Sequence, residues 1–224
     1  HELLRRVVYD ALAPSARLDL HRRVALAVEA HRPDQVELLA HHFATARIPD
    51  RAADYLERAA DRALAVRAYD TAALHLARAA DALDQIDAPH ERHFRRAARH
   101  EEVLDVLGRR GDQEAALARM ERHASADVAA EVHRRRALWL AHLDRFPEAE
   151  AEARRALELA RAAGDGGQTL AALSALGLIA CFAGRAAEGV AHLEAAAAFR
   201  GASRRQQADA RNALGQNPID LQRF

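Results

Sequence analysis

The sequence has little of what secreted proteins, membrane proteins and nucleotide-binding enzymes usually carry. Its one cysteine, Cys181, excludes an internal disulfide, so a reducing cytoplasm is the expected location. Lysine is absent, which excludes a phosphate-binding loop ending in Gly-Lys-Ser/Thr. The most apolar stretch, residues 170–183, is shorter than the roughly 20 residues of a membrane-spanning helix. We therefore expect a cytoplasmic protein that does not bind to a membrane.

The charge is high but balanced. The 33 basic residues, all arginine, are matched by 33 acidic residues, so no net field attracts a polyanion to the whole molecule. Direct nucleic-acid binding by this chain is therefore not expected.

Aromatic residues make up 4% of the chain, whereas the helix-favouring residues Ala, Leu, Arg and Glu are abundant. This composition predicts an all-α fold. Proline and glycine divide the sequence into segments of helical length, and short connections between such helices indicate antiparallel helical hairpins. The breaks fall at Pro14, Pro33, Pro49, Pro89, Gly108 to Gly111, Pro147, Gly164 to Gly167, Gly184 and Gly201.

A repeat appears when small residues twelve positions apart are aligned across each turn. Two small residues at this spacing would let two helix backbones approach closely, while a larger residue four further on fills the groove beside them. Two of the predicted units would share the helix at residues 51–67, so we interpret one of them as out of register. We prefer to pair that helix with residues 69–86. The units are Ala40, Phe43, Ala52, Leu56 and Ala59; Ala60, Ala63, Ala72, Leu76 and Ala79; Leu104, Leu107, Ala116, Met120 and His123; Ala137, Leu140, Ala149, Ala153 and Ala156; and Gly177, Ala180, Gly189, Leu193 and Ala196.

The last unit, with Gly177, Gly184 and Gly189, resembles the tetratricopeptide repeat most clearly. The resemblance implies a right-handed superhelical array of helical hairpins that presents a partner-binding surface. The spacing departs from the family's roughly 34 residues, because Ala72, Ala116, Ala149 and Gly189 are 44, 33 and 40 residues apart. The units here are therefore longer and less regular than the family pattern.

The first 30 residues lie outside the repeat. His1-Glu2-Leu3-Leu4-Arg5, Val8-Tyr9 and Leu12 resemble the end of the winged-helix region in STAND-class signal-transduction ATPases, especially bacterial LuxR-type, AfsR-type and cyclase-linked regulators. The resemblance implies a division into residues 1–31, the end of that region, residues 34–217, the repeats, and a tail at residues 218–224. His1 is similar to the nucleotide-sensing histidine of the MHD motif, and the alternative is a helix-start histidine without a special role. ATP or ADP would bind to an upstream module, and no cofactor is expected in this chain.

No catalytic constellation is recognisable, so we predict that the chain is not an enzyme. Cys181 lies in an apolar helix, where a thiol is usually inert. No metal site is predicted either. His41 and His42 are adjacent and are expected to point to different sides of a helix, and His90 with His93 lacks a zinc-binding frame.

Two arginine clusters are candidate partner-binding residues, because arginine recognises carboxylates well. An alternative interpretation is a solvated surface with acidic neighbours, and Trp139 is interpreted as a core residue. The clusters are Arg92, Arg95, Arg96 and Arg99, followed by Arg134, Arg135 and Arg136.

The resulting prediction is a regulatory module of a signal-transduction ATPase, whose repeats bind a protein or small-molecule effector and control a transcriptional or cyclase output. The alternative is a constitutive tetratricopeptide-type adaptor without nucleotide control. The chain is expected to be a piece of a longer protein. Residues 203–215 are expected to form a first helix without a partner, with Ala210, Ala213 and Leu214 available for self-association.

Overall fold

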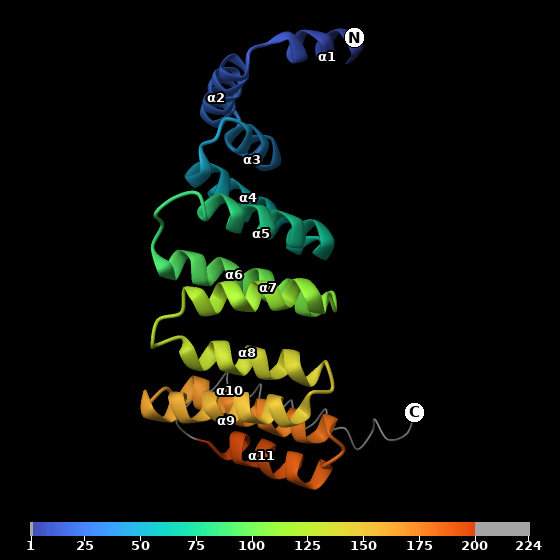
Figure 1. Cartoon of the computed structure of the whole chain (residues 1–224), viewed down its shortest axis with the longest axis vertical. Coiled ribbons are helices and arrows are strands. Elements are labelled where there is room, and N and C mark those ends of the chain that lie inside the picture. The colour runs from blue at the N-terminus through green and yellow to red at the C-terminus, as the bar shows by residue number, and fades with distance from the viewer. Residues whose placement is uncertain (1, 200–224) are drawn as a thin grey trace. The chain divides into compact units, whose positions relative to one another are not determined.

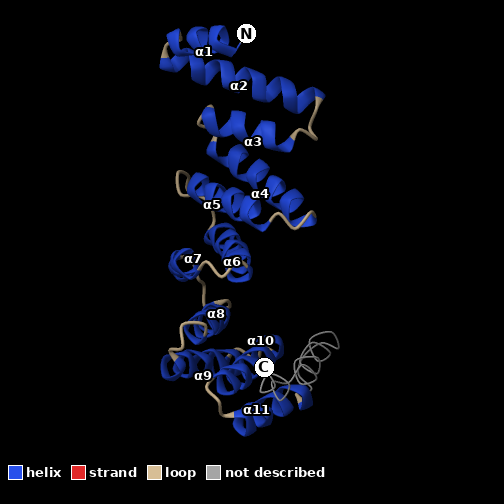
Figure 2. Cartoon of the chain, turned by 90° about the vertical axis from the view of Figure 1, so that its right-hand side faces the viewer, coloured by secondary structure: helices blue, strands red, loops and turns tan. Residues whose placement is uncertain are grey.

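The computed structural model describes the backbone of residues 2–199 and the side chains of residues 7–199, and this part of the chain contains helices and no strand (Figures 1 and 2). It divides into two units, unit 1 at His1–Arg109 and unit 2 at Arg110–Phe224. The all-α prediction is therefore confirmed. Within the described residues, no helix combines the length and the apolar character needed to cross a membrane.

Unit 1 contains six of the described helices, and from α2 to α6 successive helices pack on one another (Figure 1). The sequence breaks fall between them: Pro14, Pro49 and the residue after Pro89 begin helices, as expected of residues that lack a hydrogen-bond donor or cap a helix start. The helices are α1 (Glu2–Ala11), α2 (Pro14–His31), α3 (Val36–Thr45), α4 (Pro49–Ala65), α5 (Tyr69–Leu83) and α6 (His90–Val106).

Unit 2 repeats this arrangement with five described helices, in which successive helices also pack on one another. Helix α10, which covers most of the apolar stretch noted in the sequence, additionally packs on α8, so it is the central helix of this unit. The helices are α7 (Arg110–Arg122), α8 (Ala129–Ala141), α9 (Phe146–Ala162), α10 (Gly166–Phe182) and α11 (Ala186–Ala198).

Six of the connections are the same tight turn. In each, one residue adopts positive φ and the next backbone N–H donates to the carbonyl five residues earlier, over 2.8–3.0 Å. This bond satisfies a carbonyl that the helix end would otherwise leave free. The residues with positive φ are Arg47, Arg67, Gly108, Asp144, Gly164 and Gly184.

The turns test the predicted register, because each accepting carbonyl should belong to the second member of a unit. Phe43, Ala63, Leu140 and Ala180 all fulfil this, and four predicted units are in the correct register. The expectation that one of the first two was out of register is wrong. Helix α4 packs on both α3 and α5, and the α4 members of both predicted units are buried, so both units are real.

The predicted unit that begins at Leu104 is wrong by three residues. The carbonyl that accepts in its turn is Leu104, not Leu107, and Leu107 and His123 are only half-buried. Polar residues obscured the pattern, because the positions expected to hold small residues are occupied by buried Glu101 and Gln113. The search for small residues missed a further unit, because leucine and threonine occupy its two small-residue positions. That unit consists of Leu157, Ala160, Thr169, Leu173 and Leu176.

The predicted close approach of Gly177 on α10 and Gly189 on α11 is confirmed. A Cβ added at Gly189 would lie 2.3 Å from the Sγ of Cys181 and 2.8 Å from the carbonyl oxygen of Gly177. A Cβ added at Gly177 would lie 2.6 Å from Cγ of Leu193. No real Cβ approaches other atoms so closely, so this hairpin requires glycine at both positions.

Several predictions concern residues outside the described part of the chain. These are the nucleotide-sensing role of His1, the unpaired helix at residues 203–215 and the tail at residues 218–224. The winged-helix origin of residues 1–31 and the superhelical arrangement of the repeats stay predictions.

Candidate functional site

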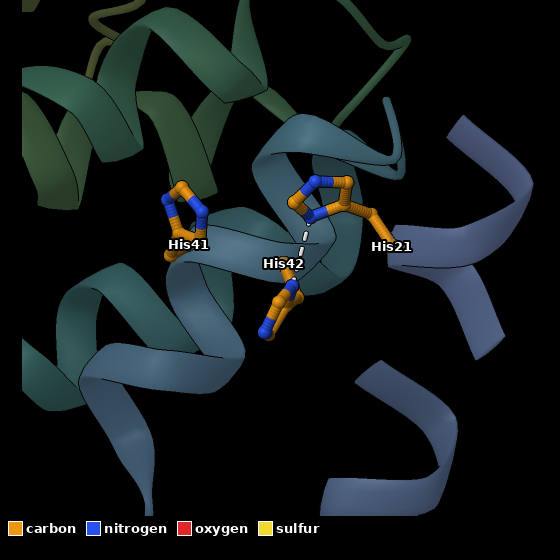
Figure 3. Close-up of side chains that lie close together, drawn as sticks. All are labelled: His21, His41 and His42. Carbon is orange, nitrogen blue, oxygen red and sulfur yellow. Dashed lines mark hydrogen bonds between the residues drawn. The ribbon is translucent and has the colours of Figure 1, made fainter. Parts of the chain in front are cut away.

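Three histidines gather between α2 and α3 in unit 1 (Figure 3). His21 projects from α2 and is 7% exposed, whereas His41 and His42 are consecutive residues of α3, the first exposed and the second half-buried. The ring centroid of His21 lies 5.6 Å from that of His41 and 4.9 Å from that of His42. One coordinating atom from each ring lies within 4.8 Å of the other two.

A chain of hydrogen bonds links three helices through this cluster. The hydroxyl of Tyr9 on α1 lies 2.9 Å from Nε2 of His21, and Nδ1 of His21 lies 2.8 Å from Nδ1 of His42. Each of these short contacts contains one proton, whose position depends on the tautomers of the rings. We call Tyr9, His21 and His42 the polar relay. It connects the predicted end of the winged-helix region to the first repeat helix.

The two histidine rings of the relay are held in their neutral form. Burial lowers the pKa of His21, and the neighbouring His41 lowers it further. Burial also lowers the pKa of His42, with additional contributions from His21 and His41. At neutral pH both imidazoles therefore keep an unprotonated nitrogen, the form that accepts hydrogen bonds and binds metal ions.

The structure corrects the argument that adjacent His41 and His42 must point apart. Adjacent helix positions differ by about 100°, not 180°, so two such side chains can border one groove. The rings of His41 and His42 have their centroids 5.2 Å apart, and His21 approaches both from the neighbouring helix. Neither His21 nor Tyr9 was singled out from the sequence, because nothing in their local pattern shows which helices pack together.

The first arginine cluster faces acidic residues within unit 1. Three arginines of α6 extend toward a row of carboxylates on α4, and the two rows share the spacing of four and three residues that places side chains on one helix face. Nη2 of Arg96 donates to Glu57 over 2.7 Å and to Asp54 over 3.1 Å. The other pairs are Arg92 with Asp50 and Asp54, and Arg99 with Asp61.

These rows border a groove of about 580 Å³, which we call the α4–α6 groove. Arg96 is 3% exposed, and its Nη1 has no hydrogen-bond partner among the described residues. Arg95, at 72% exposure, pairs with the similarly exposed Glu91 one helical turn earlier. Acidic side chains balance most of the positive charge of the groove. It is therefore better suited to a ligand whose carboxylates replace those of the protein in the ion pairs than to a ligand attracted by net charge.

The second arginine cluster makes contacts within unit 2. Arg135 pairs with Glu131 one helical turn earlier, over 2.6 Å, and Arg136 pairs with Glu121 of α7 over 2.9 Å. Arg134 is half-buried and also has an interaction partner. These contacts fit the alternative interpretation of a surface with acidic neighbours, and partner binding by this cluster stays a prediction.

The two residues interpreted as core both lie inside unit 2. Trp139 is buried, and its indole N–H donates to the carbonyl of Arg110 over 3.0 Å. Cys181 is half-buried, and burial raises the pKa of its thiol, which therefore stays protonated at neutral pH. This combination does not favour a nucleophilic role for Cys181.

Comparison with known proteins informs the fold. No protein-family model matches the sequence, and no curated protein matches it. The structure is similar to the crystal structure of BtubC (BKLC) from P. vanneervenii, with a TM-score of 0.56 over 93% of this chain and 84% of that chain. The sequences are 16% identical over the match. At this level the likeness supports a shared arrangement of helices, consistent with an α-solenoid, and leaves function to be argued from the residues.

Proposed function

We propose that this chain is the regulatory arm of a cytoplasmic signal-transduction ATPase. In this proposal the repeats form a right-handed superhelical array that binds an effector, and residues 1–31 connect it to an upstream ATPase module. The polar relay carries the proposal, because Tyr9, His21 and His42 link α1 to the first repeat helix. A conformational change on one side of these contacts would alter the packing on the other side.

Exposed apolar side chains on α1 add support. Val7 and Val8 are 65% and 62% exposed, as expected of a helix that packs against a further element. In the proposed arrangement that element is the remainder of the winged-helix region, and its packing changes with the bound nucleotide. The transcriptional or cyclase output belongs to the same parent protein.

The proposed effector surface is the α4–α6 groove. A carboxylate-bearing protein or small ligand would take over arginines that now contact acidic residues, beginning with the exposed Arg95. Since Asp50, Asp54 and Asp61 are themselves exposed to water, exchanging one of these carboxylates for that of a ligand costs little.

The test uses the full-length protein. We expect it to bind ADP and ATP, and we expect hydrogen exchange in α3 to differ between the two nucleotide states. Tyr9→Phe should abolish that difference without preventing nucleotide binding, because it removes the first hydrogen bond of the polar relay. Val66→Ala, which changes an exposed side chain beyond α4, is the matched control and should retain the difference. A full-length protein that binds no nucleotide would overturn the proposal.

A second candidate is a constitutive adaptor that holds partners together without a nucleotide. The α4–α6 groove favours it, because binding there requires no ATPase module. Partner binding that is identical with and without nucleotide would favour the adaptor, whereas a nucleotide-dependent affinity would favour the regulatory arm.

A further inference from the structure

We propose that His21, His41 and His42 form a binding site for a transition-metal ion, with zinc as its representative. The proposal concerns the chain itself and holds whether or not the chain regulates an ATPase. It depends on the convergence of three imidazoles from two helices, with one coordinating atom of each within 4.8 Å of the others (Figure 3).

The geometry requires only small movements. Zinc binds histidine nitrogens at about 2.0–2.1 Å, so two ligands of a tetrahedral site are about 3.3 Å apart. The Nδ1 atoms of His21 and His42 lie 2.8 Å apart and would separate slightly to admit the ion. His41 is exposed, so its ring is free to rotate toward the other two. Helices α2 and α3 can therefore keep their positions.

The polar relay already orients His21 as a metal ligand. When the oxygen of Tyr9 accepts a hydrogen bond from Nε2–H of His21, the lone pair of that ring is on Nδ1, which faces His42. A hydrogen-bond acceptor on the second nitrogen of a metal-binding histidine is the usual way to fix the ring and its tautomer. His42 then carries its proton on Nε2, so the ion takes the place of the proton between the two Nδ1 atoms.

The donor set indicates the class of metal. Three imidazoles suit zinc, copper and nickel, whereas magnesium and calcium require oxygen ligands. Three protein ligands leave a fourth position to water or an incoming ligand. The bound ion would fasten α2 to α3, because His21 belongs to one helix and the other two ligands to the next.

Calorimetric titration of the chain with zinc chloride tests the proposal, with magnesium chloride as the reference. We expect one zinc ion to bind per chain, and magnesium not to bind. His41→Ala and His42→Ala should each weaken zinc binding at least tenfold. His31→Ala changes an exposed histidine at the end of α2 and is the matched control, which should bind zinc as the wild type does.

Two further readouts separate loss of the site from loss of the fold. The circular dichroism of His41→Ala should match that of the wild type, since an exposed ring is removed. Cobalt(II) in place of zinc should give the intense visible absorption of a tetrahedral site, and His41→Ala should lose it. Unchanged zinc affinity in both His41→Ala and His42→Ala would overturn the proposal, as would zinc binding that His31→Ala weakens equally.

Discussion

The two units use the same turn but differ in how charged side chains connect their helices. In unit 1, charged side chains connect different helices, as between Arg51 of α4 and Glu29 of α2, or between Arg96 of α6 and Glu57 of α4. In unit 2, several charged pairs lie within one helix or at its start, as between Arg154 and Glu150, and buried alanines line the helix contacts there as they do in unit 1. Pairs between helices also occur in unit 2, for example Arg136 with Glu121, Arg185 with Glu150 and His133 with Glu152.

This difference shows that the same helical repeat can be stabilised by close packing or by charged and histidine side chains between its helices. Helices separated by small residues are held by close packing, which depends on shape and little on salt or pH. Helices joined by ion pairs and histidines depend on both. We therefore expect unit 1 and unit 2 to respond differently to the same conditions, and the following variants test that expectation.

The largest effect should come from overpacking unit 2. Gly189→Leu places atoms where a single Cβ already lies 2.3 Å from Cys181 and 2.8 Å from the backbone of Gly177. We expect it to lower the free energy of unfolding by about 3 kcal/mol, measured by urea denaturation. Ala187→Leu, at an exposed position of the same helix, should cost less than about 0.5 kcal/mol. Equal losses in the two variants would contradict the register of this hairpin.

Removal of the central arginine of unit 1 should have the next largest effect. Arg96→Ala leaves Glu57 and Asp54 without their shared partner and creates space beneath the groove. Because Asp54 is half exposed, solvent reduces the loss, which we expect to be about 2 kcal/mol. Arg95→Ala removes a pair exposed on both sides and should cost under about 0.5 kcal/mol. The measurement is urea denaturation with and without 1 M salt. If salt leaves the difference in unfolding free energy between wild type and Arg96→Ala unchanged, lost packing and not lost charge pairing explains the destabilisation.

A pH effect is expected in unit 1. The pKa values of His21, His42 and His75 are all lowered from 6.5, chiefly by burial, and for His75 Arg78 lowers it further while Glu37 raises it. The unfolded chain therefore takes up protons first as the pH falls. The stability from these neutral histidines is complete above pH 6.5 and is lost as the pH falls through their folded-state pKa values.

Hydrogen exchange at pH 8 and pH 5.5, with a chelator present, measures this effect in each unit. The protection of the α5 backbone amides against exchange should fall at the lower pH. His75→Leu should reduce that fall, because it removes one of the three histidines with a lowered pKa. A fall of the same size in wild type and His75→Leu would show that His75 does not contribute.

The smallest effect concerns the turns. Gly184 adopts a φ of 77° with open space around it, so Gly184→Ala should cost only the strain of that backbone conformation, about 1 kcal/mol. Arg67 adopts a φ of 57° at the equivalent position of unit 1, and Arg67→Gly should stabilise the chain by about 0.5 kcal/mol. Thermal unfolding of the two variants should shift in opposite directions, and shifts of the same sign would contradict the equivalence of these turns.

Much of the fold could be predicted from the sequence because helix propensity, breakers and small-residue spacing are local signals. The Gly177 and Gly189 pair is the clearest example, since its spacing alone predicted a close approach. The unit around Leu104 could not be placed correctly, because buried Glu101 and Gln113 carry no signal of burial in their chemistry. The turns at Arg47 and Arg67 were equally hidden, since arginine rarely marks positive φ.

The candidate sites were harder to predict, because they depend on which helices are neighbours. Arg92, Arg96 and Arg99 could be chosen by charge and spacing, but the carboxylates that meet them are about 40 residues earlier in the chain. His21 and His42 are 21 residues apart on separate helices, and only the packing of α2 on α3 brings them together. A search for metal ligands within one helix could not find such a pair.

The recurring turn also bears on how such a chain could lengthen during evolution. Its closing bond joins two backbone groups, and arginine, aspartate and glycine all occupy its central position. A gene segment that encodes a helix with its turn could therefore be duplicated without the turn sequence having to match its new neighbours. New helices would need only a compatible face of small residues, so repeats could be gained or lost while the rest of the chain kept its structure.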